Sequence, residues 1–165
     1  MKITLNDIDV LIFDFDGVLT NNLVYLNNDG EEFVSCNRAD GLGFEAIKML
    51  NKPVYIISTE KNLVVTARAK KLNIPVLQGV KNKVECILDL SNKEGFKLEK
   101  ILYVGNDLND FHAMQLCGYS VCPKDSHKKI KSLAKVILNS NGGYGVVREL
   151  LEDVLSVDLL ELLYK

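Results

Sequence analysis

The sequence contains no tryptophan, only three prolines and no long hydrophobic run. No segment approaches the roughly 18 consecutive apolar residues that a membrane-spanning helix requires, and the polar amino terminus does not resemble a secretion signal. The formal net charge of −2 also lacks the basic excess that is typical of nucleic-acid-binding proteins. We therefore expect a cytoplasmic protein without a membrane or nucleic-acid partner.

Histidine and cysteine are also scarce. The two histidines and four cysteines form no Cys-x-x-Cys pair and no Cys–His cluster, which argues against a zinc site or a disulfide framework and predicts buried free thiols in a reducing cytoplasm. The length of 165 residues, of which 47% are hydrophobic, is enough for one domain with a real core and too short for two ordinary ones. We therefore expect residues 1–165 to form a single domain.

Short apolar runs alternate with amphipathic segments along the chain. The three strongest runs span residues 10–13, 54–57 and 101–104. Three weaker runs span residues 75–77, 119–122 and 136–138. Runs that are apolar at consecutive positions are typical of strands buried on both faces, as in a parallel sheet covered by helices. Apolar residues at helical spacing lie within residues 42–50, 63–72 and 84–88. This βαβ succession predicts an α/β fold, a Rossmann-like three-layer sandwich with a mostly parallel central sheet.

One segment departs from this alternation. Residues 23–26 and 31–34 are rich in strand-forming residues and flank an Asp-Gly pair, which is a strong turn signal. The pattern predicts a β-hairpin flap at about residues 20–36, between the first strand and the first helix. At the other end of the chain, the amphipathic and acidic character of residues 146–163 predicts a C-terminal helical tail at about 144–165, for packing or oligomerisation.

Polar side chains follow the three strongest strands at the points where these strands end. Asp14 and Asp16 follow the first strand, Ser58 the second, and Asn106 and Asp107 the third. In an open parallel sheet, ligands bind at this carboxyl edge. Each strand end taken alone also fits a turn or a helix cap. Two aspartates so close together repel each other unless a cation lies between them, so they also fit a divalent-cation site of the kind that Mg²⁺ prefers.

A carboxylate such as Asp14 can attack phosphorus and form an acyl phosphate. A cation and a lysine must then offset the negative charge of the phosphate ester. Lys83 is the candidate lysine, because it opens a predicted helix, where a cation opposes the helix dipole and is better explained by a nearby anion. Ser58 and Thr59 precede another predicted helix, whose opening amides would cradle phosphate, although the same pair also fits an N-cap.

Four motifs in the expected order resemble those of the haloacid dehalogenase superfamily, and the match covers nearly the whole chain. They are Asp14-Phe15-Asp16-Gly17-Val18-Leu19-Thr20, Ser58, Lys83, and Gly105-Asn106-Asp107-Leu108-Asn109-Asp110. The resemblance implies a Mg²⁺-dependent phosphatase in which Asp14 attacks phosphorus and Asp16 protonates the leaving group. Asp16 would then take a proton from the water that hydrolyses the aspartyl phosphate, while Lys83 holds phosphate oxygens.

The resemblance also implies where the metal binds. Asp14, the main-chain carbonyl of Asp16 and a residue of the fourth motif would hold Mg²⁺. That motif usually begins Gly-Asp-Asp, whereas this chain has Asn106 at the first of the two acidic positions. An amide oxygen coordinates Mg²⁺ without contributing charge, so metal affinity is expected to fall. Asp107 offers a compensating ligand, and both residues remain candidates.

Further segments resemble the capless branch that includes 3-deoxy-octulosonate 8-phosphate phosphatase and the nonulosonate 9-phosphate phosphatases. They lie at residues 37–43, 78–83 and 142–149. In that branch a short hairpin and the neighbouring subunits of a tetramer shape the substrate site in place of a cap domain. The resemblance therefore implies a homotetramer without a cap domain that acts on a 2-keto-3-deoxy sugar acid phosphate.

Three charged residues refine the expected substrate. Octulosonate enzymes usually carry Gly-Arg after the second-motif residue, whereas this chain has Thr59 and Glu60, as the nonulosonate 9-phosphate phosphatases do. Arg68 and Lys71 stand on the following helix where that branch places Arg and Lys. The resemblance therefore favours a nonulosonate 9-phosphate, with Glu60, Arg68 and Lys71 as substrate-binding residues that act across a subunit boundary.

Two other functions share some of these features. Similar domains occur fused to acylneuraminate cytidylyltransferases, where they look catalytically degenerate in vertebrates, so a tetramer-forming module of a sialic-acid pathway is the main alternative. A phospho-acceptor signalling domain also carries an aspartate at a strand end. Such a domain does not need a leaving-group acid at Asp16, and it gives the hairpin no role.

Overall fold

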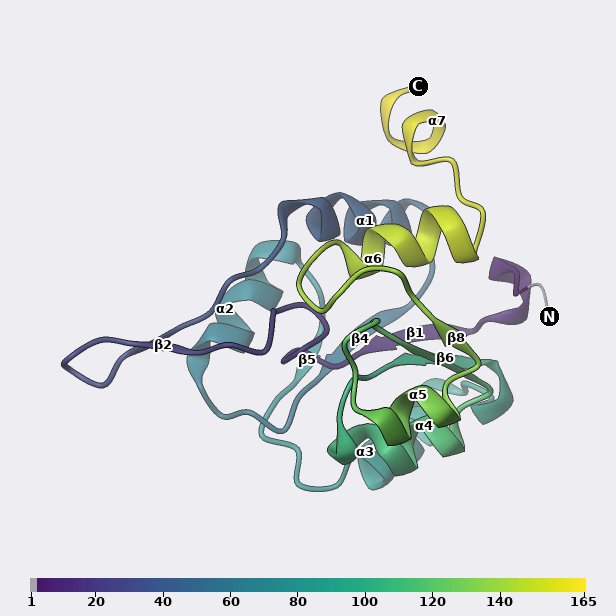
Figure 1. The fold of residues 1–165 in the computed structure, drawn as a ribbon. Helices are drawn as coiled ribbons and strands as arrows, with labels where there is room; N and C mark the ends of the chain where they lie inside the picture. Colours follow the sequence, from purple (N-terminus) through teal and green to yellow (C-terminus); the bar gives the residue numbers. More distant parts are fainter. Residues whose placement is uncertain (1–2) are drawn as a thin grey trace.

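The computed structural model describes residues 3–165, which are built around a six-stranded sheet (Figure 1). Its strands lie in the order β5 (Val76–Leu77), β4 (Val54–Ile57), β1 (Val10–Phe13), β6 (Ile101–Val104), β7 (Tyr119–Cys122) and β8 (Val136–Ile137). All neighbouring strands are parallel. The predicted α/β fold with a parallel sheet is confirmed, and all six apolar runs form strands.

Helices cover both faces of this sheet. One layer contains α1 (Arg38–Met49), α2 (Leu63–Leu72) and α6 (Val146–Glu149), and the other contains α3 (Lys83–Glu94), α4 (Phe111–Leu116) and α5 (Lys128–Leu133) (Figure 1). Alternate residues of β1 enter different cores, Leu11 and Phe13 on the α1 side and Val10 and Ile12 on the α3 side. Burial on both faces explains why this strand is apolar at every position. Three layers are therefore present, as predicted.

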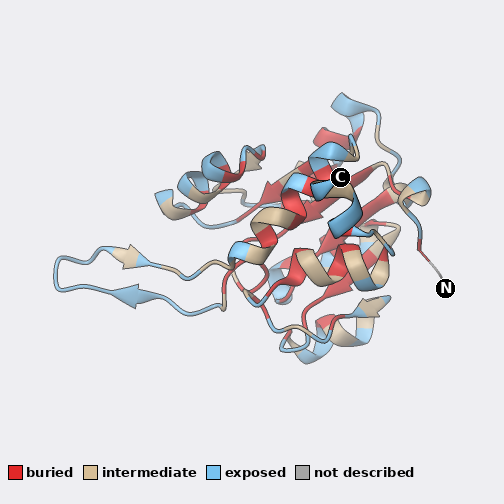
Figure 2. Cartoon of the chain, turned by 90° about the horizontal axis from the view of Figure 1, so that it is seen from above, coloured by how far each residue is buried: buried red, intermediate tan, exposed pale blue. Residues whose placement is uncertain are grey.

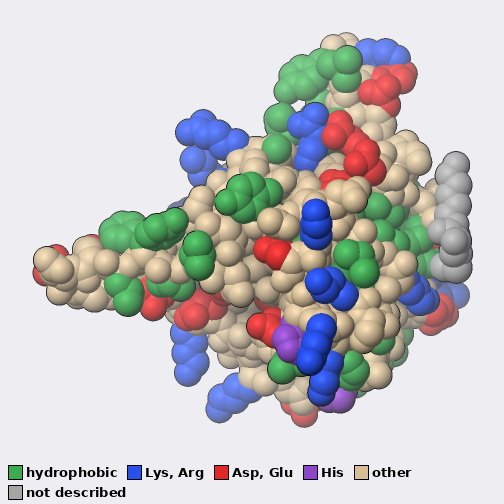
Figure 3. Space-filling view, in the orientation of Figure 1, with side chains coloured by type: hydrophobic (Ala, Val, Ile, Leu, Met, Phe, Trp, Pro, Cys, Tyr) green, Lys and Arg blue, Asp and Glu red, His purple; other side chains and the backbone are tan. Residues whose placement is uncertain are grey.

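The predicted hairpin is also present. Strands β2 (Tyr25–Leu26) and β3 (Glu32–Phe33) pair antiparallel, and a bridge between Thr20 and Cys36 closes the base of the flap. The flap projects far from the sheet and is exposed along most of its length (Figures 1 and 2). Hydrophobic side chains remain uncovered on it (Figure 3). Those more than half exposed are Leu23, Val24, Tyr25, Leu26 and Phe33.

The C-terminal tail differs from the single amphipathic segment that the sequence predicts. Helix α6 continues into a π-helical segment, η4 (Leu150–Val154), and the chain then turns before α7 (Leu159–Tyr164). Ser156 lies in this turn with a left-handed backbone, at φ +55°. Hydrophobic periodicity runs across the break because apolar residues on both sides are buried, so the pattern alone does not reveal the turn.

The cysteines and the helix lengths bear on two further predictions from the sequence. All four cysteines are free thiols, as predicted, but only Cys117 and Cys122 are buried, whereas Cys36 and Cys86 are partly exposed. No helix within residues 3–165 is long and apolar enough to cross a bilayer. The short helices α4 and α5, by contrast, were not expected, because six residues show no clear amphipathic period.

A buried carboxylate joins the first helix to the C-terminal segment. Asp40 of α1 accepts hydrogen bonds through Oδ1 from the backbone amides of Val147, at 2.8 Å, and Arg148, at 3.4 Å. Nearby, a Cβ on Gly43 would lie 2.9 Å from Val147 Cγ1, so α1 and α6 are closely packed there. Asp40 therefore holds the start of the tail against α1.

We expect the Asp40→Ala variant to lose about 1–3 kcal/mol of unfolding free energy, because the buried Val147 amide would lose its acceptor. Urea denaturation measures the change. Burial raises the pKa of Asp40 to about 6, so above that pH the buried charge itself lowers stability. The experiment is therefore run below pH 6, where the carboxyl is neutral and one of its oxygens still accepts the hydrogen bonds. Asp40→Asn keeps an acceptor oxygen and should lose less. Equal stability of Asp40→Ala and the parent protein would contradict this interpretation.

Candidate active site

Asp14 continues the central strand β1 at the carboxyl edge of the sheet. Its amide donates to the carbonyl of Val104 at 2.9 Å, which ties the residue to β6. Its side chain is buried, and Oδ1 accepts from the amide of Phe15 at 2.8 Å. The same oxygen lies 2.8 Å from Lys83 Nζ. Asp14 is therefore a buried carboxylate held in one orientation beside an ammonium group.

Lys83 begins α3, and only 4% of it is exposed. Besides Asp14, its ammonium contacts Asp110 Oδ1 at 2.6 Å, and Asp110 is fully buried. Burial acts most strongly against the charge of Lys83, but the carboxylates of Asp14 and Asp110 together raise the pKa of its ammonium. The expectation that an anion lies near this lysine is correct, and the fold itself supplies two.

The two first-motif carboxyls are harder to ionise than ordinary aspartates. Burial, followed by the Asp110 carboxylate, raises the pKa of Asp14 against the opposing effect of Lys83. Asp16 is half-buried, and burial, followed by the charge of Glu60, raises the pKa of its carboxyl. Asp16 therefore retains its proton more readily, which is the property that a general acid needs.

Asn106 places a buried side-chain oxygen in the site. Its Oδ1 makes no hydrogen bond within residues 3–165. Gly17 packs against the same amide, since a Cβ there would lie 1.9 Å from Asn106 Nδ2, and its φ of +77° also favours glycine. Asp107, in contrast, is exposed and its Oδ1 accepts from the Leu108 amide at 2.7 Å. Of the two fourth-motif candidates, Asn106 offers the unpartnered oxygen.

Buried oxygen atoms in proteins nearly always have a hydrogen-bond or metal partner, and a cation is a suitable partner for the Oδ1 of Asn106. The residues present therefore fit a hard divalent cation held by oxygen atoms. Within residues 3–165, however, no group of three or more His, Cys, Asp or Glu side chains is placed to hold a metal ion. A cation here would depend on the Asn106 amide and on backbone or water oxygens in addition to the carboxylates.

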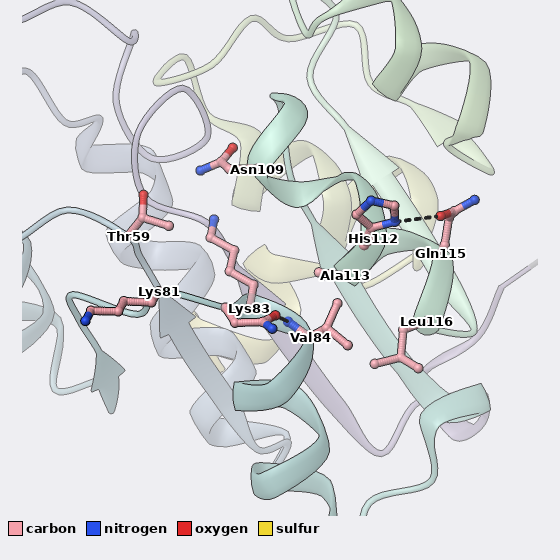
Figure 4. Close-up of a pocket in the computed structure, with 10 residues that line it drawn as sticks. Thr59, Lys81, Lys83, Val84, Asn109, His112, Ala113, Gln115 and Leu116 are labelled. Atoms are coloured by element: carbon pink, nitrogen blue, oxygen red, sulfur yellow. Dashed lines mark hydrogen bonds between the residues drawn. The ribbon is translucent and has the colours of Figure 1, made fainter.

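A cavity of about 350 Å³ opens over these groups. Its lining residues are Asp14, Asp16, Asn22, Thr59, Asn106, Asp107, Leu108 and Asn109. A larger groove of about 660 Å³ adjoins it and shares Thr59 and Asn109. Figure 4 shows the amino end of Lys83 directed toward the side of this groove where Thr59 and Asn109 lie. The structure thus brings Asp14, Asp16, Lys83, Thr59 and Asn106 to one place.

The loop after β4 differs from the expectation. Ser58 is buried and its hydroxyl accepts from the Glu60 amide at 3.0 Å, while Thr59 is exposed. The prediction that the amides after this pair open the next helix is wrong, because α2 begins later, with Asn62 as its N-cap. The amides of Lys61 and Asn62 instead donate to Glu60 Oε1, at 2.6 and 2.8 Å. The Glu60 carboxylate therefore accepts the hydrogen bonds of the amides that were expected to face phosphate.

Arg68 and Lys71 lie away from Asp14. They line a separate cavity of about 550 Å³ that shares no lining residue with the cavity over Asp14. Arg68 Nη2 donates to the carbonyl of Asn37 at 2.9 Å, which directs the guanidinium toward the start of α1. Within one chain, the structure does not bring these two residues to the Asp14 site.

Two residues of the site were given no role in the sequence analysis. Asp110 closes the fourth motif, and its position four residues after Asn106, within one helical turn, is the pattern that could have indicated it. Tyr103 sits in the buried strand β6 and donates its hydroxyl to Asp110 Oδ1 at 2.8 Å. Nothing in an apolar run distinguishes such a tyrosine from an ordinary core residue.

Comparisons with known proteins identify the family and agree with the fold. A family model described as haloacid dehalogenase-like hydrolase matches residues 45–150. A 3-deoxy-D-manno-octulosonate 8-phosphate phosphatase of Salmonella typhi is 38% identical over 144 residues, which cover 87% of this chain and 77% of that protein. The solved structure of a Streptomyces avermitilis protein assigned to the HAD hydrolases has a TM-score of 0.93 and 39% identity, covering 96% of this chain and 91% of that one.

A second solved structure carries ligands. It is the 3-deoxy-D-manno-octulosonate 8-phosphate phosphatase of Moraxella catarrhalis, in complex with magnesium, phosphate and KDO. Its TM-score to this chain is 0.85, with 29% identity and coverage of 94% of this chain and 87% of that one.

Proposed function

The chain belongs to the haloacid dehalogenase-like hydrolases, and on that premise we propose that it is a Mg²⁺-dependent phosphatase of a 2-keto-3-deoxy sugar acid phosphate. The observation that carries the proposal is the position of Asp14. This buried carboxylate lies at the end of the central strand, 2.8 Å from the Lys83 ammonium, and lines a cavity together with Asp16 and Asn106. Phosphoric monoester hydrolysis is the activity that this arrangement serves best.

Asp14 is the nucleophile in this proposal. Its carboxylate attacks phosphorus in line and forms an aspartyl phosphate, while the ester oxygen leaves with a proton from Asp16. Burial and Glu60 raise the pKa of Asp16, which suits it to donate that proton. In the second step Asp16 takes a proton from water, which hydrolyses the aspartyl phosphate and frees Asp14. Asp16 therefore acts first as an acid and then as a base.

Ser58, Thr59 and Lys83 hold the phosphate oxygens, and the charge of Lys83 offsets part of the negative charge of the phosphoryl group. Asp14, Asp16 and Asn106 would hold Mg²⁺, with Asp107 as a further oxygen donor at the edge of the cavity. When bound, Mg²⁺ supplies positive charge that stabilises the phosphoryl group in the transition state. The unpartnered Oδ1 of Asn106 supports this assignment.

The proposed substrate is a nonulosonate 9-phosphate, in preference to an octulosonate 8-phosphate. The Salmonella typhi and Moraxella catarrhalis relatives act on the octulosonate ester by name. The preference for the nine-carbon acid rests instead on Glu60, with Arg68 and Lys71, where this chain resembles the nonulosonate branch. It places the enzyme in sialic-acid-type or other surface-sugar biosynthesis in the cytoplasm.

A homotetramer completes this proposal. Arg68 and Lys71 line a cavity apart from Asp14 in the same chain, so in this proposal they meet the substrate at Asp14 from a neighbouring subunit. The hairpin leaves Tyr25 and Leu26 more than half exposed, and burial of such apolar surface between subunits would stabilise an assembly.

A panel of sugar acid phosphates, assayed for phosphate release at increasing Mg²⁺, tests the proposed function. We expect turnover of nonulosonate 9-phosphate at least about 10-fold above octulosonate 8-phosphate in kcat/KM, the discrimination that a small difference in substrate size can supply. Turnover should vanish in EDTA. Faster hydrolysis of the octulosonate ester would overturn the substrate preference but not the phosphatase.

The second candidate function is a non-catalytic assembly module of a sialic-acid pathway. The observation in its favour is Asn106, which contributes no charge to the metal site. Native mass spectrometry beside the panel separates the two functions. Intact tetramers without turnover of any sugar phosphate, even at high Mg²⁺, would favour the module.

A further inference from the structure

Tyr103 is linked to the catalytic centre by a buried chain of hydrogen bonds. It lies on the central strand β6 and is fully buried. Its hydroxyl donates to Asp110 Oδ1 at 2.8 Å, and the same oxygen accepts from Lys83 Nζ at 2.6 Å. Lys83 in turn lies 2.8 Å from Asp14 Oδ1. Two buried residues, Asp110 and Lys83, thus connect the phenol hydroxyl to the nucleophile.

Asp110 is fully satisfied in this arrangement. Its second oxygen, Oδ2, accepts from the amides of Asn106, at 2.9 Å, and Asp107, at 3.3 Å. Gly105 leaves room for the carboxylate, since a Cβ there would lie 2.6 Å from Asp110 Cγ. Four donors therefore fix this one buried carboxylate. Lys83 and the amides of Asn106 and Asp107 belong to the four sequence motifs, whereas Tyr103 does not.

A phenylalanine would fill the same space in the core without a polar atom. Burying a hydroxyl is unfavourable unless it is hydrogen-bonded, so the useful feature of a tyrosine here is its bond to Asp110. Because Oδ1 is shared, its negative charge is divided between the phenol and the ammonium. Lys83 is then held less tightly by Asp110 and remains available to Asp14. Burial raises the pKa of Tyr103 well above its ordinary value, so the hydroxyl stays a neutral donor.

We propose that Tyr103 is a positioning residue for phosphoryl transfer, whose hydroxyl orients Asp110 so that the Lys83 ammonium stays beside Asp14 where the phosphate enters. The proposal rests on the phosphatase function proposed above. Tyr103 does not line the cavity over Asp14, and its hydroxyl bonds to Asp110, so it acts through Asp110 and Lys83.

The Tyr103→Phe variant tests this proposal with the removal of one oxygen. We expect kcat to fall about 10-fold, with KM changed by less than about 2-fold, because a misplaced Lys83 stabilises the transition state less well. Tyr55→Phe is the matched control. Tyr55 lies on β4 of the same sheet, and its ring packs edge-on against Phe96, but its hydroxyl makes no hydrogen bond within residues 3–165. An equal kcat for Tyr103→Phe and Tyr55→Phe would overturn the proposal.

A readout independent of turnover separates positioning from simple support of the core. In protein labelled with ¹⁵N-lysine, the ammonium signal of Lys83, assigned by its loss in Lys83→Met, should move in Tyr103→Phe and stay in place in Tyr55→Phe. An unmoved signal would overturn the proposal even if the parent protein proved inactive, whereas lack of turnover by the parent sinks only the proposed function. If Tyr103→Phe does not fold, 3-fluorotyrosine at position 103 is used instead, because it keeps the ring and the hydroxyl but makes the hydroxyl more acidic. The Lys83 ammonium signal should then move, and an unmoved signal would again overturn the proposal.

Discussion

The Asp14→Asn variant is expected to lose at least about 10³-fold in kcat, the order of loss seen when a nucleophile is removed from an enzyme. An amide of nearly the same shape cannot form the acyl phosphate, because its oxygen is a poor nucleophile toward phosphorus. Its Oδ1 still accepts from the Phe15 amide, so the fold around it should persist. Steady-state phosphate release measures the loss.

Rapid acid quenching followed by intact-mass and peptide analysis tests the same step directly. The parent protein should carry one phosphoryl group on the peptide that contains Asp14, and the variant should carry none. Asp153→Asn, at an exposed position near the C-terminus, is the control and should behave like the parent. Full activity of Asp14→Asn, or phosphate on another residue of the parent, would show that the hydrolysis arises elsewhere.

The Lys83→Met variant is expected to damage both catalysis and stability. Loss of one charged donor to the phosphoryl group should lower kcat/KM about 10²- to 10³-fold. Without the ammonium, Asp14 and Asp110 are two buried carboxylates that no cation separates. Removal of one partner from a buried ion pair typically costs about 3–5 kcal/mol, so the unfolding free energy should fall by that order at neutral pH.

The pH dependence of this loss follows from the carboxyls that Lys83 leaves behind. Lys83 lowers the pKa of Asp14, so in its absence that pKa rises further above the ordinary value of 3.8. A raised folded-state pKa means that the native state binds more protons than the unfolded state between the two pKa values, so stability falls as pH rises. The pKa of Asp14 in the parent is already raised to about 8, so both folded proteins keep this proton between pH 3.8 and about 8, and the deficit of Lys83→Met should be constant there. Above about pH 8 the parent loses this proton first, because Lys83 favours the carboxylate, so the deficit should grow.

Urea denaturation at neutral pH and above about pH 8 measures both parts of this prediction. Lys81→Met is the matched control, because Lys81 is exposed two residues earlier on the same loop and its side chain points away from Lys83 (Figure 4). It should change neither kcat/KM nor stability appreciably. A deficit for Lys83→Met that is the same at both pH values would mean that the buried carboxylates are not the cause.

The fold was largely predictable from the sequence because burial leaves a periodic trace. A strand covered on both faces must be apolar at every position, and the runs at residues 10–13 and 101–104 show that pattern directly. Polar residues at the ends of parallel strands meet at one edge, so the strand pattern alone is enough to group Asp14, Ser58 and Asn106. The Asp-Gly turn likewise predicted the hairpin.

Other features depend on local backbone conformation that the hydrophobic pattern does not encode. The left-handed turn at Ser156 interrupts the tail although the apolar pattern continues across it. Glu60 takes the amides that were expected to face phosphate, because its own loop bends back before α2 begins.

The amino-acid sequence by itself determined the parallel sheet, the hairpin flap and the edge at which the acidic and amide side chains gather, because all three follow from local periodicity and turn chemistry. Only the tertiary structure decided that Lys83 is shared between Asp14 and Asp110, that Tyr103 donates to the same carboxylate, and that Arg68 and Lys71 lie apart from it. Those relations depend on how separate strands and helices pack. A buried charge selects its partners by distance and desolvation rather than by position along the chain.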